Sequence, residues 1–172
     1  MTVENVLLKH FLAGLAYRTH KAVSGAPPGF ATFQAAPGVR TPHQLIHHMS
    51  GVMSFALGHL VNCELRFESH DSFDQELERF HSILDQIGDI LDSDPVFVDS
   101  SPKQLLQGPF ADAMTHVGQI AMLRRLSGSP IPPENFHDAD ISADNLTRVQ
   151  SSPVSPDEYW LDADGNPQGM SS

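Results

Sequence analysis

The sequence has very little cysteine, with only Cys63 among 172 residues. A single cysteine cannot form an intramolecular disulfide, so nothing in the sequence indicates an oxidising compartment. Cysteine outside disulfides is among the residue types most often buried in proteins. We therefore expect Cys63 to pack in the interior rather than to act as a nucleophile.

Positive charge is also scarce. Ten Lys and Arg residues stand against 21 Asp and Glu residues, which gives a formal net charge of -11 at pH 7. A surface with this balance repels the phosphate backbone of DNA or RNA. We therefore do not expect a nucleic acid as a partner.

Long apolar runs are missing as well. A helix that crosses a bilayer needs roughly 20 mostly apolar residues, and the uninterrupted apolar runs here are far shorter. The first residues, MTVENVLLKHFLAGL, contain an acidic residue and a broken apolar run, unlike the charged start and apolar block of a signal peptide. These features predict a cytoplasmic protein without a membrane anchor.

What remains is an ordinary globular composition. Hydrophobic residues make up 40% of the chain and charged residues 18%, which is well away from the composition of a disordered chain. A chain of this length can bury a substantial core within one domain.

Four segments show apolar residues at three- and four-residue steps, the spacing of an amphipathic helix. They cover about residues 3–20, 41–67, 72–92 and 101–128. In the first segment the spacing predicts a buried face that begins with Val3 and Leu7. The segment 72–92 has the most regular pattern. Between the first two segments, residues 24–40 contain too many Gly and Pro residues for a helix and predict a long loop.

Several residues mark where these helices should begin, bend and end. Thr41 and Ser101 are each followed by proline, and this pair of a capping side chain and a first-turn proline is typical of a helix start. Pro109 lies inside the last segment and should kink it or separate a short leading turn. Gly128 is expected to end that helix.

From residue 129 to residue 172 the chain has little helical period. We interpret residues 1–128 as a helical bundle, and residues 129–172 as an irregular extension that packs on the bundle or is partly disordered. Apolar residues that could dock this extension are Ile131, Phe136, Ile141, Leu146, Val149, Tyr159 and Trp160.

The ten histidines are numerous for a chain of this length. His48 shares a helical stripe with Leu45, Val52 and Phe55, which predicts that it faces the bundle interior. A buried imidazole without a partner is costly, so His48 should have a hydrogen bond, an acidic neighbour or a metal ion. His47 falls on what looks like an outer face. Five other histidines have no companion ligand at useful spacing and are expected at the surface or at helix ends: His10, His20, His70, His81 and His137.

Asp112 and His116 stand four residues apart, so both side chains lie on one face of the last helix. Together with His48 from a facing helix they would form a nitrogen- and oxygen-liganded site with open positions, suited to zinc, nickel or iron. The alternative is an ordinary ion pair between Asp112 and His116, with His48 as a hydrogen-bonded core histidine. Spacing alone favours the ion pair and the core histidine, because a single pair of Asp and His four residues apart is a weak signal of a metal site.

Two stretches resemble motifs of the DinB-like family. Residues 41–49, TPHQLIHHM, resemble the helix-two pattern of that family, and residues 112–128, DAMTHVGQIAMLRRLSG, resemble its helix-four pattern HxxxHxGQ. The resemblance covers about residues 1–128. It implies an all-α fold, an up-and-down-type four-helix bundle with one long connection, in which three histidines bind a divalent metal ion.

Carried over by position, the resemblance implies that His48 and His116 are metal ligands. Asp112 stands where the family pattern has the first histidine of its HxxxH pair. A carboxylate also binds zinc, nickel or iron, which would make a set of two histidines and one carboxylate. The same substitution is compatible with weakened or lost metal binding.

The resemblance also implies a function. Characterised relatives include thiol-dependent transferases and isomerases that use low-molecular-weight bacterial thiols, so we expect a metal-dependent transferase or hydrolase that acts on a small molecule. Substrate contacts would come from the 24–40 loop and the C-terminal extension, and a homodimer is compatible with the family. The alternative is a non-enzymatic, stress-related binding or dimerisation module that kept the bundle and lost the chemistry.

Overall fold

The computed structural model describes residues 1–63, 65, 68–97, 99–154, 159–161, 164 and 166–169, and it is predominantly helical. The main helices are α1 (Val3–Val23), α2 (Pro42–Val61), α3 (Phe73–Asp92), α4 (Pro102–Leu105) and α5 (Ala111–Leu126). A short 3-10 helix, η1 (Phe30–Thr32), lies in the first loop, and a π-helical turn, η2 (Leu106–Phe110), joins α4 to α5. Strands β1 (Tyr159–Leu161) and β2 (Pro167–Gly169) form an antiparallel pair near the C-terminus. The helical class predicted from the sequence is confirmed for the body of the molecule.

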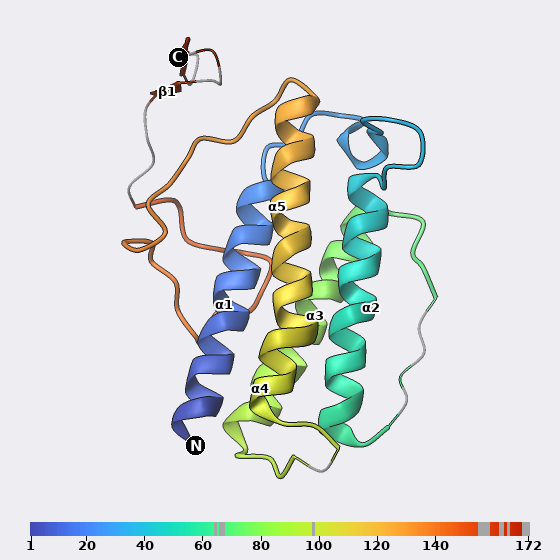
Figure 1. Ribbon diagram of the computed structural model, residues 1–172, viewed down its shortest axis with the longest axis vertical. Coiled ribbons are helices and arrows are strands. Elements are labelled where there is room, and N and C mark those ends of the chain that lie inside the picture. Colours follow the sequence, from blue (N-terminus) through green and yellow to red (C-terminus); the bar gives the residue numbers. More distant parts are fainter. Residues whose placement is uncertain are drawn as a thin grey trace.

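The long helices form a bundle in which α1 and α2 each pack against both α3 and α5. Figure 1 shows that α1 and α5 run in one direction and that α2 and α3 run in the other. A contact of 2.9 Å between His43 Nε2 and the His70 carbonyl joins the start of α2 to the residues just before α3. The helices therefore do not alternate strictly up and down, because the chain returns along the bundle between α2 and α3.

The core lies between the four long helices. Its largest fully buried side chains include Leu12 of α1, Ile46 of α2, Phe80 of α3 and Phe110 of η2. Burying a side chain of this size contributes about 1.5–3 kcal/mol. Val3 and Leu7 are exposed, contrary to expectation, since α1 turns the neighbouring stripe that contains Leu8 and Leu12 toward its partners. Among the described residues, no helix combines the length and the apolar character needed to span a bilayer.

Helix α2 begins as expected and ends earlier than expected. Thr41 and Gln44 form a reciprocal capping box at its start. At its end Asn62 takes a left-handed conformation, with φ of 51°, and the helix stops at Val61 instead of continuing to about residue 67. Asn adopts this conformation more readily than most residues and breaks the helical repeat. Cys63 follows this break and is exposed, so the expectation that it packs in the interior is wrong.

The predicted irregularity at Pro109 is present. The π-helical turn η2 contains this proline and separates the single turn of α4 from α5. Proline has no N–H to donate and its ring displaces the preceding turn, which accounts for the wider winding. At the far end Gly128 has φ of 78° and its N–H bonds the Arg125 carbonyl, the expected glycine end of the helix.

Residues 129–154 of the extension run back over the bundle (Figure 1). Leu146 is 2% exposed and lies against Gly88 of α3, where a Cβ on the glycine would be 2.3 Å from Leu146 Cδ1. His81 is buried and bonds the Leu146 carbonyl, so the expectation that it lies at the surface is wrong. Val149 is exposed and does not dock. The side chains of residues 159 and 160 lie outside the described part.

Candidate metal centre

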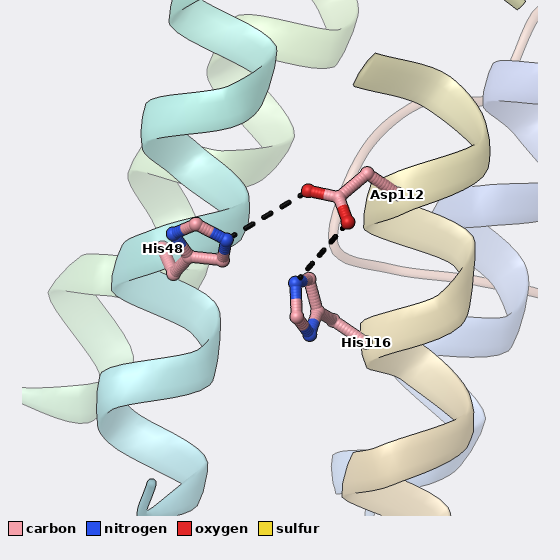
Figure 2. Close-up of side chains that lie close together, drawn as sticks. All are labelled: His48, Asp112 and His116. Atoms are coloured by element: carbon pink, nitrogen blue, oxygen red, sulfur yellow. Dashed lines mark ion pairs between the residues drawn. The ribbon is translucent and has the colours of Figure 1, made fainter. Parts of the chain in front are cut away.

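Three side chains from two packed helices converge on one point. His48 comes from the second turn of α2, and Asp112 and His116 come from the first turns of α5. Helices α2 and α5 pack directly against each other. Figure 2 shows the imidazole of His48 facing Asp112 and His116 across the gap between the helices. The structure thus brings together the three ligands predicted from the sequence.

The separations are close to those of atoms that share one ion, and somewhat longer. His48 Nε2 lies 3.7 Å from Asp112 Oδ2, and His116 Nε2 lies 3.6 Å from Asp112 Oδ1. Two ligand atoms that each lie about 2.1 Å from a tetrahedral ion are about 3.4 Å apart. One ligand atom from each of the three residues lies within 4.8 Å of the other two. These three residues therefore form a group that could hold a metal ion.

The same distances bear on the interpretation of Asp112 and His116 as a simple ion pair. A charge-assisted N–H to carboxylate bond is about 2.7–2.9 Å long. Both nitrogen–oxygen pairs here are longer, at 3.6 and 3.7 Å. Asp112 therefore lies between the two imidazoles without a short hydrogen bond to either one. The distances between the Asp112 oxygens and the two imidazole nitrogens leave room for an ion that contacts all three side chains.

The ring of His116 is held by a second contact on α5. Its Nδ1 lies 2.8 Å from Gln119 Oε1. Because an amide oxygen only accepts, Nδ1 carries the hydrogen and donates it, and in the neutral ring the lone pair is then on Nε2. This is the nitrogen that faces Asp112. A metal-ligating histidine is commonly oriented in this way, with its other nitrogen bonded to a fixed acceptor.

The three residues differ in exposure. The side chain of His48 is 36% exposed, that of Asp112 is 49% exposed and that of His116 is 9% exposed. His48 is therefore at the mouth of the site and not in the bundle interior, as its stripe predicted. Burial lowers the pKa of His48, and the nearby Arg40 and His116 lower it further, while Asp112 acts against them. The neutral imidazole, which is the form that binds metal, is favoured.

The site opens into a cleft of about 1200 Å³ that is lined by the first loop, α2, η2 and the start of α5. Asp112 and His48 are part of its wall, and Arg40 and Gln34 line it from the loop. Phe55 also lines the cleft and is exposed, contrary to its predicted place in the interior. A metal ion held by the three residues would therefore be reached directly from the cleft.

Comparisons with family models, with curated proteins and with solved structures gave no match to this chain. The description of the site therefore depends on the geometry of its own residues.

Two residues of the cleft were missed by the sequence analysis. His47, which was placed on an outer face, lines the cleft, and its Nδ1 lies 3.3 Å from the buried carboxylate of Glu76 on α3. Arg40 lines the cleft from the loop. Helical spacing carries no signal for a loop residue, and it cannot show that α3 lies behind His47.

Of the two segments expected to contact a substrate, the structure places only one at the cleft among the described residues. Four residues of the 24–40 loop do line the cleft: Gln34, Gly38, Val39 and Arg40. Within the described part of the extension, residues 129–154, none lines this cleft, since that segment runs over other faces of the bundle. Among the described residues, the first loop, α2, η2 and the start of α5 are the elements that can contact a molecule in the cleft.

Proposed function

We propose that this chain is a metal-dependent enzyme of the DinB-like kind, in which His48, Asp112 and His116 hold a zinc, nickel or iron ion. The observation that carries the proposal is the convergence of three ligand atoms within 4.8 Å of one another at the wall of a large cleft. Two imidazoles and one carboxylate suit each of these ions.

The donor set supports a catalytic rather than a purely structural ion. Structural zinc sites are closed by four protein ligands, whereas catalytic sites have three and leave a position open. Here three protein ligands are present among the described residues, and two of them also form the cleft wall. A small molecule in the cleft would meet the open side of the site.

The residues of the chain have separable roles in this proposal. Asp112 lies between the two imidazoles and supplies the negative charge of the site. Gln119 keeps the Nε2 lone pair of His116 directed at the ion by accepting the hydrogen from Nδ1. A bound ion would supply one thing, a lowered pKa for a thiol or water in its open position, which is the chemistry of a thiol-dependent transferase or a hydrolase.

The first test is metal content. Wild-type protein is incubated with zinc, nickel or ferrous iron, freed of excess ion and analysed for bound metal, beside His48→Ala, Asp112→Ala and His116→Ala. We expect near-stoichiometric metal in the wild type and a loss of at least about tenfold in affinity in each variant. His59→Ala, on the same helix as His48 but not among the three ligands, should keep its metal.

Each variant is checked for folding by circular dichroism, so that loss of metal is not confused with loss of structure. A folded wild-type protein that binds none of the three ions would contradict the proposal and favour the non-enzymatic binding module. If metal binds, the loaded protein is assayed for hydrolysis of an activated ester and for thiol-dependent alkylation of an electrophilic probe. The two assays separate the hydrolase from the transferase.

A further inference from the structure

The cleft beside the metal centre contains one arginine, Arg40. Among the described residues that line the cleft it is the single Lys or Arg, and Asp112 is the single carboxylate. Arg40 also lines a neighbouring hollow of about 590 Å³ whose wall includes His116 and Gln119. It therefore stands where two hollows meet beside the metal centre.

The guanidinium of Arg40 has no carboxylate of its own. Within the described residues it forms no ion pair and no hydrogen bond, although the chain has a net charge of -11. Some other cations are paired, such as Lys9 with Asp92 and Lys21 with Glu134, whereas Arg125 also forms no ion pair among the described residues. Arg40 thus has its five N–H donors available in the cleft.

The backbone around Arg40 is held in place on both sides. On one side Gln34 Nε2 donates to the Val39 carbonyl at 2.9 Å and closes the loop, where Gly38 has φ of 81°. On the other side Thr41 begins α2 with its capping box. The base of the arginine side chain is therefore fixed at the cleft before any ligand arrives.

The charges of the cleft favour an anion at this place. The carboxylate of Asp112 lies between His48 and His116, and among the described residues it forms no ion pair with Arg40. A divalent ion in the site would leave the region positive. A guanidinium binds carboxylate or phosphate through two parallel hydrogen bonds.

We propose that the cleft takes a small molecule with a carboxylate or phosphate group, and that Arg40 binds this group next to the metal centre. Val52 and Phe55 line the cleft from later turns of α2, and no second Lys or Arg is among its described lining residues. The anionic group is thereby directed to the Arg40 end. The idea that another group of the bound molecule reacts at the metal ion rests on the proposed function. The contact between Arg40 and the anionic group does not require the ion.

The test measures binding of acetate and of inorganic phosphate by calorimetry at low ionic strength, with and without zinc. The proteins are the wild type, Arg40→Gln and Arg125→Gln. Arg125 is exposed, likewise forms no ion pair among the described residues and lines neither hollow, so it controls for the loss of one positive charge. The comparison of the two anions shows which group the site prefers, and acetamide serves as a neutral probe.

We expect Arg40→Gln to weaken binding of at least one anion about tenfold or more, because it removes a charge-assisted contact. Arg125→Gln should bind within about twofold of the wild type. Zinc content should stay unchanged in both variants, which separates this inference from the metal proposal.

Equal anion binding by wild type and Arg40→Gln would overturn the inference, and so would a wild type that binds neither anion with or without zinc. If zinc does not bind but Arg40→Gln still loses the anion, the inference stands without the metal proposal.

Discussion

At the scale of single residues, the candidate metal centre depends on which nitrogen of each histidine would face an ion. For His116 the structure indicates which nitrogen this is, because Gln119 Oε1 accepts a hydrogen bond from Nδ1 at 2.8 Å. Both residues lie on α5, three positions apart, so the arrangement is local to one helix. The contact leaves Nε2 as the ligand atom.

Removing this contact should weaken the site without removing a ligand. We expect Gln119→Ala to lower zinc affinity about 10- to 100-fold, the usual effect of losing a group that orients a ligating histidine. Gln119→Glu keeps an acceptor at the same position and should retain most of the affinity. Competition with a chelator of known affinity measures both values, and an unchanged affinity in Gln119→Ala would show that the contact does not orient the ligand.

At the scale of elements, α3 is the helix that carries both a core face and the attachment of the extension. Its apolar spacing produces the buried stripe of Leu77, Phe80, Leu84 and Ile87. The next position after Phe80 is His81, whose Nδ1 donates to the Leu146 carbonyl at 3.0 Å while its Nε2 is buried without a hydrogen-bond partner. Protonation of this ring would place an unpaired charge between the helix and the extension.

This histidine should make stability depend on pH. Burial lowers the pKa of His81 to about 4, and the hydrogen bond to Leu146 only partly opposes this shift. Because the folded pKa lies below the unfolded value of about 6.5, the stabilisation is complete above pH 6.5 and is lost as the pH falls toward 4, by about 3 kcal/mol. Urea unfolding at several pH values measures the change.

The matched variants are His81→Asn, which keeps a donor for the Leu146 carbonyl, and His137→Asn, which alters an exposed histidine. We expect His81→Asn to reduce the change in the free energy of unfolding between pH 4 and 6.5. His137→Asn should leave this change as in the wild type. The same slope in all three proteins would mean that His81 is not the group responsible.

At the scale of the whole molecule, the extension after α5 is tied to the bundle at points far apart in the sequence. Leu146 is 2% exposed and completes the core beside Gly88 of α3. Glu134 accepts hydrogen bonds from Tyr17 and Lys21 of α1. Residues 129–154 of the extension are therefore a component of the folded unit, away from the cleft.

Truncating the apolar anchor should destabilise the protein. We expect Leu146→Ala to lower the free energy of unfolding by about 2–5 kcal/mol, since it removes buried volume from a packed position. Val149→Ala removes an exposed side chain and should change stability by less than about 0.5 kcal/mol. Chemical denaturation gives both values, and equal stability of the two variants would show that Leu146 does not anchor the extension.

Much of the fold could be predicted from local patterns. The stripe of α3 predicted a helix over 72–92, and Ser101, Pro109 and Gly128 marked the start, the irregular turn and the end of the last helical segment. These features depend on interactions within a few residues, which the sequence displays directly. The end of α2 was missed because Asn62 alone gives no clear stop signal, although its left-handed conformation ends the helix.

For the site, the sequence by itself determined that Asp112 and His116 share a helix face, because residues four apart in a helix are neighbours. The packing of α2 against α5 decided that His48 meets them and that it does so at a half-exposed cleft wall. Tertiary structure likewise decided that Arg40 and His47 line this cleft and that His81 is buried under Leu146. Such contacts join residues distant in the chain, and only the relative placement of packed helices and loops brings them together.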